Sequence, residues 1–359
     1  MSLLDMLKGF KTFNSTVVPH VVVGEYGSFF ERLVSCGIST EIIPIPEFRK
    51  IQHFFKRAPF ISRLAELCEQ RRIEIIHANN HRVAAWSALV ARKSGILSCC
   101  SIRTIIDARR ARKSLVFEND RIMPVAKALQ RAMGISDREK ICPIYYGIDM
   151  PDFIAPDENL LSRLNIPRQS GKRVGFMGTL TKRKGPQLLI EAIPKVLSEL
   201  PDTMFIFIGR GKQEFVEQLQ TRAERLGVAG NVVFSGFLES GAKYLKILDL
   251  FVLPSLKEPL ARVMKEAMYA GLPVVGANTG GTPEIVEHDR TGRLFPPGRP
   301  ELLAQEILFY LKNDRIRKEH GELARQRATE LFDITTCVGR MEELYMEMRE
   351  SVKPKQKTG

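Results

Sequence analysis

Short apolar segments alternate with helical patterns along almost the whole sequence, and this alternation limits the chain to a small group of folds. Segments such as VVPHVVV (17–23) and IEIIH (73–77) have the length of buried strands, and segments with apolar residues at helical spacing follow them. Strands that alternate with helices usually pair in parallel through βαβ units. The sequence therefore predicts an α/β protein with parallel sheets.

The alternation occurs in two series, which an interval containing Pro151, Pro156 and Pro167 separates. Prolines at this density are typical of connecting segments, and 359 residues are enough for two domains. The predicted strands are 17–23, 41–46, 73–77 and 98–106 in the first series, and 173–177, 203–208, 231–235, 250–253, 273–276 and 293–295 in the second. The predicted division is a doubly wound domain over 1–150, a linker over 151–172, a doubly wound domain over 173–334, a helix over 335–352 and a basic tail over 353–359. An interdomain cleft is expected between the two domains.

The net charge of +13 is concentrated in the first domain, where residues 1–150 contain 23 Lys and Arg against 14 Asp and Glu. Such a surface attracts a phosphorylated substrate, an anionic membrane surface or nucleic acid, and an ordinary solvated surface is the alternative. The densest basic cluster consists of Arg103, Arg109, Arg110, Arg112 and Lys113. A phosphate-bearing or lipid-linked acceptor, or an anionic leaflet, would explain it. Nucleic acid is not expected, because the cluster has few aromatic residues for base stacking.

Transmembrane helices, zinc sites and disulfide frameworks are not expected. No window approaches the ~18 uninterrupted apolar residues of a membrane span. Residues 1–13 form an amphipathic helix in this prediction and not a signal peptide, because Asp5 and Lys8 interrupt the apolar stretch. The six cysteines form no CxxC pair, which favours a reducing compartment. The expected location is cytoplasmic, with peripheral attachment to the inner face of the membrane.

The segment from Leu253 to Glu287 has the features of an anion site. A strand ends at Leu253, and a helix is predicted to begin near Pro259, because proline is tolerated at the first helical position. The N–H groups of Leu260, Ala261 and Arg262 would then face an anion such as a diphosphate. Carboxylates at Glu258 and Glu266 suit the hydroxyl pairs of a sugar and a ribose. Two surface glutamates on an ordinary helix are the alternative.

Glycines follow three further strands of the second series. Gly178-Thr179 opens the loop GTLTKRKG, in which Lys184 is placed to meet a phosphate. Gly209 follows the strand 203–208, and the pair Gly280-Gly281 follows the strand 273–276. Glycine allows a ligand to approach the backbone closely, although each glycine could simply serve a turn.

Over about 120 residues the order and spacing of these motifs resemble the donor-binding half of retaining glycosyltransferases of family 4, which have the GT-B fold. The matching segments are Gly178…Lys184-Gly185, Ile208 to Gly211, Val232 to Gly236, Leu253-Pro254-Ser255, Glu258-x7-Glu266, Ala270 to Val275, Gly280 to Glu284 and Thr291-Gly292. In residues 1–150 the resemblance is confined to short pieces around Gly27, Ile76 to Ala78, and Tyr146 to Asp149.

The resemblance implies a retaining glycosyl transfer from a nucleotide-sugar donor to a saccharide, lipid-linked or other cell-surface acceptor. Glu266 would hold the donor ribose, Glu258 the sugar hydroxyls, and Lys184 the diphosphate together with the backbone at Leu260 and Ala261. Glu258 and Lys184 are accordingly the expected catalytic residues, and Gly178, Thr179, Gly209, Gly280 and Gly281 the expected further donor contacts. No metal or other cofactor is expected. The final helix would cross back to the first domain.

The sequence also departs from the family pattern, and these departures keep two other functions open. Thr179 stands where the family has an arginine, Ala261 stands where it has a glycine, and the first strand with its Gly-rich loop is either absent or lost by truncation. His77 and Arg103 are the predicted acceptor contacts, the alternative for His77 being a hydrogen bond to local backbone. The alternatives are a degenerate GT-B protein that binds nucleotide-sugar without transfer, and a related phosphorylase or epimerase.

Overall fold

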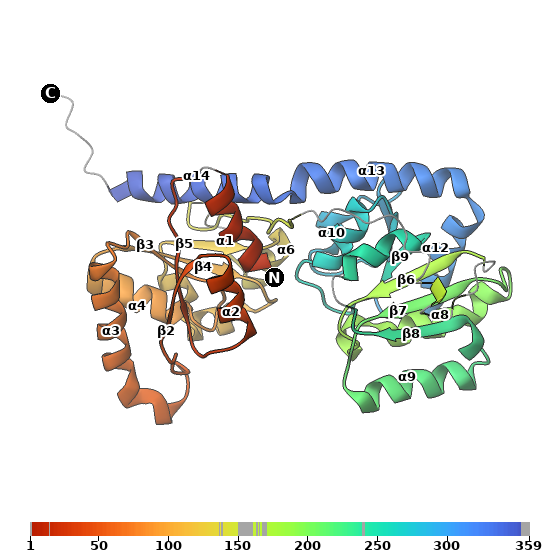
Figure 1. Cartoon of the computed structure of the whole chain (residues 1–359), viewed down its shortest axis with the longest axis horizontal. Coiled ribbons are helices and arrows are strands. Elements are labelled where there is room, and N and C mark those ends of the chain that lie inside the picture. The colour runs from red at the N-terminus through yellow and green to blue at the C-terminus, as the bar shows by residue number, and fades with distance from the viewer. Residues whose placement is uncertain are drawn as a thin grey trace. The chain divides into compact units, whose positions relative to one another are not determined.

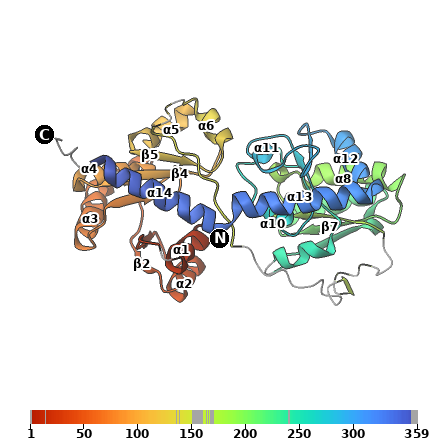
Figure 2. The same cartoon turned by 90° about the horizontal axis from the view of Figure 1, so that it is seen from above.

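The computed structural model of the chain describes residues 2–13, 15–135, 137, 139–149, 161–162, 164, 166, 171–238 and 241–352. The chain divides into two units, which Figures 1 and 2 show in two views. Unit 1 consists of Met1–Asp149 and Phe332–Gly359, and unit 2 of Met150–Leu331. Most of the predicted linker over 151–172 and all of the predicted tail over 353–359 lie outside the described residues.

Unit 1 contains two small parallel sheets. The first pairs β1 with β2, and the second has the strand order β3-β4-β5. The strands are β1 (His20–Val23), β2 (Ser39–Ile42), β3 (Ile75–Ala78), β4 (Leu97–Ile102) and β5 (Arg121–Pro124). The helices are α1 (Ser2–Thr12), α2 (Ser28–Ser35), α3 (Arg57–Gln70), α4 (Ala84–Ser94), α5 (Ala108–Lys113), α6 (Lys127–Met133) and α14 (Ile334–Val352), with the 3-10 helices η1 (Ile51–Lys56) and η2 (Val116–Glu118).

Apolar stripes hold the helices of unit 1 in place. Trp86 of α4 is 3 % exposed, packs edge-on against Phe60 of α3, and donates its Nε1–H to the carbonyl of Pro46 at 3.1 Å. Leu4 and Leu7 of α1 pack with Leu33 of α2. Burial of large aromatic and aliphatic side chains on one face of each helix therefore decides which face of that helix meets its neighbours.

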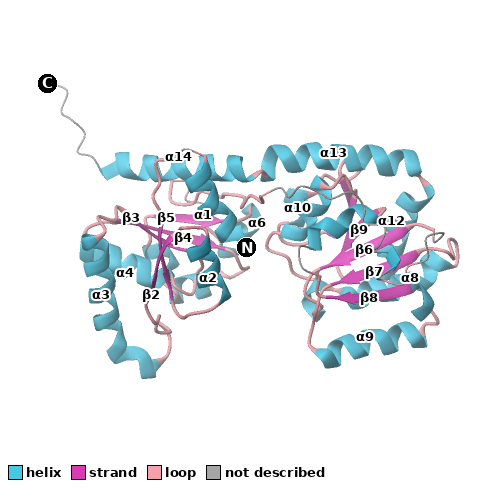
Figure 3. Ribbon diagram, in the orientation of Figure 1, coloured by secondary structure: helices cyan, strands magenta, loops and turns pink. Residues whose placement is uncertain are grey.

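Unit 2 contains one six-stranded parallel sheet with the order β11-β10-β9-β6-β7-β8 (Figure 3). The strands are β6 (Arg173–Met177), β7 (Met204–Ile208), β8 (Val232–Gly236), β9 (Leu250–Leu253), β10 (Val274–Ala277) and β11 (Gly292–Phe295). The helices are α8 (Pro186–Leu197), α9 (Gln213–Arg225), α10 (Arg262–Tyr269), α11 (Thr282–Ile285), α12 (Pro300–Lys312) and α13 (Asp314–Phe332), with η3 (Lys182–Lys184), η4 (Ala229–Asn231) and η5 (Gly241–Ile247).

The strand order of unit 2 reverses between β6 and β9. From β6 the chain proceeds outward through β7 to β8, and from β9 it proceeds outward the other way through β10 to β11. Phe176, Phe205 and Phe207 are fully buried in the centre of this sheet, as expected of strands covered on both faces. Ligands of open parallel sheets bind beyond the carboxyl ends of the strands at such a reversal, so the loops after β6 and β9 are the first place to look for a site.

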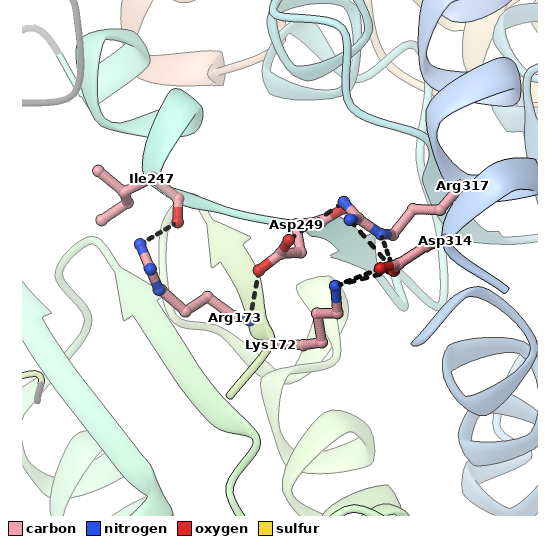
Figure 4. A network of polar contacts seen from close by, with 6 residues as sticks. All are labelled: Lys172, Arg173, Ile247, Asp249, Asp314 and Arg317. Atoms are coloured by element: carbon pink, nitrogen blue, oxygen red, sulfur yellow. Dashed lines mark hydrogen bonds and ion pairs between the residues drawn. The ribbon is translucent and has the colours of Figure 1, made fainter. Parts of the chain in front are cut away.

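A polar network fastens α13 to the opposite, amino edge of the same sheet (Figure 4). Asp249 accepts the backbone N–H of Arg173 at 2.9 Å and lies 3.1 Å from Arg317 of α13. Arg317 and Lys172 both contact Asp314. Contacts between opposite charges therefore fix α13 to the amino edge of the sheet.

Some elements of unit 1 were not predicted from the sequence. The strand β5 and the helices α5 and α6 were not predicted, and the strand predicted over 98–106 ends at Ile102. β5 is four residues long and carries Arg121 and Pro124 at its ends, so its apolar signal is too short to stand out.

Candidate functional site

The loops that follow β6 and β9 meet at the reversal of the strand order in unit 2. The loop after β6 contains η3, and the backbone N–H of Leu256 in the loop after β9 donates to the carbonyl of Arg183 at 2.8 Å. Gly185 ends this loop at φ 76°, and a Cβ placed there would lie 2.1 Å from the carbonyl oxygen of Pro254. Only glycine therefore lets the two loops approach this closely.

Lys184 and Glu258 form an ion pair across the two loops. The Nζ of Lys184 lies 2.5 Å from Oε2 of Glu258, and the two side chains are 15 % and 5 % exposed. Ser255 Oγ donates to the same carboxylate oxygen at 3.2 Å, and Arg183 Nη1 lies 3.7 Å from it. A carboxylate this buried is stabilised by its cations, while the lysine has two further N–H donors for an anionic ligand.

The helix after β9 begins later than predicted. α10 begins at Arg262 and not near Pro259, because the carbonyl of Glu258 accepts the N–H of Gly281 at 2.9 Å and the preceding segment stays irregular. Ala261 is the N-cap and supplies no capping side chain. The predicted helix start near Pro259 is therefore wrong, and the contact of a diphosphate with the backbone N–H groups of Leu260, Ala261 and Arg262 stays a prediction.

Glu266 lies inside α10 and is 7 % exposed. Its Oε1 accepts from Nε of Arg262 at 2.7 Å, four residues earlier on the same helix face. The arginine holds one carboxylate oxygen, which restricts the orientation of the other. The side chain of Arg262 was not singled out from the sequence, although its i,i+4 spacing to Glu266 is a signal that could have found it.

The predicted glycines all stand at carboxyl ends of strands in unit 2. Gly178 has φ 146° and Gly209 has φ 142°, and a Cβ on Gly209 would meet the carbonyl oxygen of Gly178 at 2.0 Å. Gly280 has φ 54°, and Gly281 is the N-cap of α11. Thr179, the departure from the family pattern, is exposed at the same edge. The structure thus brings the predicted donor residues to one edge of one sheet.

The predicted acceptor residues lie in unit 1. His77 is within β3, and its ring nitrogens lie 2.7 Å from Tyr345 Oη and 2.7 Å from Ser101 Oγ. Ser101 Oγ lies 2.8 Å from Tyr146 Oη. The two partners of His77 are thus side chains of β4 and α14, so the alternative of a hydrogen bond from His77 to local backbone is wrong. Burial lowers the pKa of His77 to about 4, with a further contribution from the charge of Arg103.

Arg103 follows β4 and is held by two neighbours. Its Nη1 donates to Oδ1 of Asn79 at 3.1 Å, and its guanidinium lies 4.9 Å from the centre of the Tyr146 ring. Arg103 and His77 therefore belong to one polar group at the carboxyl half of the β3-β4-β5 sheet. Whether either contacts an acceptor stays a prediction.

Neither a metal-binding cluster nor a membrane-spanning helix is found among the described residues. In the described part of the chain, no group of three or more His, Cys, Asp or Glu side chains is arranged to hold a metal ion. None of the helices among the described residues combines the length and the apolarity that crossing a bilayer requires.

Comparisons with known proteins relate this chain to glycosyl transferases. Residues 162–327 match the family described as "Glycosyl transferases group 1". The chain is 32 % identical over 212 residues to spore coat protein SA of Bacillus subtilis (strain 168), covering 55 % of this chain and 56 % of that protein. It is 25 % identical over 300 residues to N-acetyl-alpha-D-glucosaminyl L-malate synthase of Bacillus anthracis, covering 80 % and 78 %. The chain thus spans about half the length of the first relative and more of the second.

Among solved structures, Anabaena Alr3699/HepE in complex with UDP superposes with a TM-score of 0.83 at 23 % identity, covering 96 % of this chain and 95 % of that one. At this identity the likeness establishes the fold. Both parallel-sheet units have counterparts there, because nearly the whole of each chain is covered. Residues 162–327 therefore resemble the glycosyl transferases group 1 family, and the two parallel-sheet units of the chain have the GT-B fold.

Proposed function

We propose that the chain transfers a sugar from a nucleotide-sugar to a hydroxyl acceptor, with retention of the anomeric configuration, as a family 4 type enzyme of cell-envelope polysaccharide assembly. The observation that carries this proposal is the meeting of Lys184 and Glu258 at the strand-order reversal of unit 2, in the loops that precede α8 and α10. The solved structures of Anabaena Alr3699/HepE in complex with UDP and with UDP-glucose make a uridine diphosphate sugar the first donor to test.

Each group at this edge has a role that follows from its charge. Lys184 and the first N–H groups of α10 bind the diphosphate, Glu258 accepts hydrogen bonds from the sugar hydroxyls, and Glu266 accepts them from the ribose. Because the charge that develops on the departing diphosphate is the largest change during transfer, its stabilisation by Lys184 and the helix N-terminus is the main catalytic contribution.

The chemical step balances without an enzyme nucleophile. The bond between the anomeric carbon and the diphosphate oxygen breaks, the acceptor oxygen bonds to the same face of that carbon, and the departing phosphate oxygen takes the acceptor proton. No divalent ion is required in this proposal, because Lys184, assisted by Lys182 and Arg183 on η3, supplies the positive charge. Transfer is then expected to continue at the same rate in excess EDTA.

Calorimetric titration with a panel of nucleotide-sugars tests the donor site. Lys184→Ala and Glu266→Gln should each weaken donor binding about tenfold or more, since each removes a hydrogen bond to a charged group worth ~1.5–3 kcal/mol. Lys195→Ala and Glu191→Gln are matched controls, because these residues pair with Glu199 and Arg222 on helices away from the loops after β6 and β9. Unchanged affinity in the first two variants would contradict the proposal.

A catalytically degenerate protein that binds nucleotide-sugar without transfer is the second candidate. The exposed Thr179 favours it, because a threonine there supplies no cation to the diphosphate. Product analysis after incubation with donor and candidate acceptors separates the two functions. Tight donor binding with neither hydrolysis nor transfer would favour the degenerate protein.

We further propose that unit 1 attaches to an anionic membrane surface, on the cytoplasmic side. Phe54 and Phe55 of η1 are 58 % and 88 % exposed, and the exposed cations Lys50 and Lys56 flank them. Exposed aromatic rings beside basic side chains are suited to the lipid interface. Co-sedimentation with vesicles that contain phosphatidylglycerol should fall for the pair Phe54→Ser and Phe55→Ser, and binding that is equal in the variant would contradict this.

A further inference from the structure

His81 is a buried histidine that nothing in the proposed transfer reaction uses. It lies in the loop between β3 and α4 and is 3 % exposed, yet neither Nδ1 nor Nε2 has a hydrogen-bond partner. A buried polar group without a partner costs the free energy of its lost hydration. Such groups are uncommon in folded proteins, and each one requires an explanation.

Positive charge from three arginines in three different segments acts on this histidine. Burial lowers the pKa of His81, and the positive charges of Arg110, Arg82 and Arg49 lower it further. Their side chains are exposed, and none of the three is in an ion pair in the part of the chain that the structure describes. The pKa of Glu47 is lowered by its hydrogen bond to Lys50, whose Nζ lies 2.6 Å from the carboxylate, and to a smaller extent by the charge of Arg82. Among the described residues none of the three guanidinium groups is therefore in an ion pair, and Asp107 accepts only the backbone N–H of Arg110, at 2.7 Å.

The backbone beside His81 also favours a negatively charged ligand. α4 begins at Ala84, and its N-cap, Val83, makes no capping hydrogen bond through its side chain. The helix is 11 residues long, so the partial positive charge at its N-terminus lies next to the three arginines. The loop 79–83 follows the carboxyl end of β3, and α5 with Arg110 follows that of β4. This is the edge of a parallel sheet at which ligands bind.

We propose that Arg49, His81, Arg82 and Arg110 form a binding site for a phosphate group. The guanidinium groups would bind its oxygens with paired N–H donors, and the neutral imidazole would donate one N–H to a further oxygen. Because the ring nitrogens do not touch solvent in the ligand-free chain, binding requires the side chains over the ring to move. Where the proposed glycosyl transfer holds, on which this step rests, the phosphate belongs to the acceptor.

NMR spectra of the histidine rings test the site directly. The six histidines give separate reporters, and His320 of unit 2 is an internal reference because its Nδ1 already has the Tyr310 hydroxyl as a partner. Titration of the full chain with inorganic phosphate, against sodium chloride of equal ionic strength, should shift the His81 signals in a saturable way. Arg82→Gln and Arg110→Gln should weaken the phosphate affinity about tenfold each. Arg92→Gln is the matched control, since Arg92 lies in the last turn of α4 and pairs with Glu118.

His81→Phe separates binding from folding, because an apolar ring of similar size removes the unpartnered nitrogens without opening a cavity. In a calorimetric titration with inorganic phosphate this variant should bind more weakly than the original, and it should keep or raise its melting temperature. Sugar monophosphates against the parent sugars, and phosphatidic acid vesicles against phosphatidylcholine vesicles, show whether a small molecule or a lipid supplies the phosphate.

The outcomes for this site and for the donor site are distinguishable. A His81 signal that does not respond to phosphate, to a sugar phosphate or to phosphatidic acid overturns the phosphate site, even where donor binding is normal. Donor binding that is absent while His81 responds to phosphate overturns the glycosyl transfer and leaves the phosphate site in place. A response of equal size in the Arg82→Gln variant would also overturn the assignment.

Discussion

The Nζ of Lys184 and Oε2 of Glu258 are 2.5 Å apart, although the two residues are 74 positions apart in the sequence. The pair joins the loop after β6 to the loop after β9, the two strands between which the strand order reverses. This buried ion pair is therefore one of the interactions that hold together the two segments that would carry the donor, and it is the natural starting point for mutagenesis.

Lys184→Met should destabilise unit 2 more than the double variant Lys184→Met, Glu258→Gln. The single change leaves a buried carboxylate with one distant cation, at a cost of about 3 kcal/mol, whereas the double change removes the charge as well. Hydrogen exchange of the β6 and β9 amides, followed by mass spectrometry, measures the difference. Equal protection in the two variants would show that the pair contributes little.

Gly185→Ala should be far more damaging than Gly271→Ala, although both glycines have positive φ angles of 76° and 82°. A Cβ at Gly185 meets the carbonyl of Pro254, while one at Gly271 has no atom within 4 Å. The strain of a positive φ alone costs about 1 kcal/mol, so Gly271→Ala should lower the melting temperature of unit 2 only slightly. Comparable losses in both variants would contradict the close approach of the two loops.

Arg262→Gln should raise the KM for the donor several-fold with a smaller change in kcat. Arg262 acts by positioning Glu266, so its loss disorders a group that binds ribose and leaves the reacting atoms in place. Arg262→Lys keeps the charge and should restore part of the affinity. A fall in kcat at constant KM would place Arg262 in direct contact with the departing diphosphate.

The donor half of the site was largely predictable because its signals are local in the sequence. The strands over 173–177 and 250–253 have the predicted bounds, since each is a short apolar run ended by a glycine or proline turn. The start of α10 was not predictable, because it depends on the hydrogen bond from Gly281 to Glu258, which no local pattern reveals. The same holds for the partners of His77, one of which is Tyr345, 268 positions away.

Unit 1 should lose stability as the pH falls below about 6.5. The pKa of His77 is lowered to about 4 in the folded chain, so between these values the unfolded chain binds more protons than the folded one. The contribution of His77 between about pH 7 and about pH 5 is about 2 kcal/mol. The single tryptophan, Trp86, lies in unit 1, so its fluorescence during urea unfolding reports on this unit alone.

His77→Gln isolates that contribution, because His20 and His81 also have lowered pKa values and act in the same direction. The variant should be less stable than the original at neutral pH but should lose less stability on acidification. A pH dependence of equal slope in both proteins would assign the effect to other groups.

Because α14 contributes Tyr345 to the core of unit 1, that unit is assembled from the two ends of the sequence. On a ribosome, the contiguous residues of unit 2 are all synthesised before α14 exists, so unit 2 can reach its native state first. Until α14 has been synthesised, His77 and the face of the unit 1 sheet that α14 covers stay exposed. A chain released before α14 would thus expose this surface to chaperones and proteases while its other half is already folded.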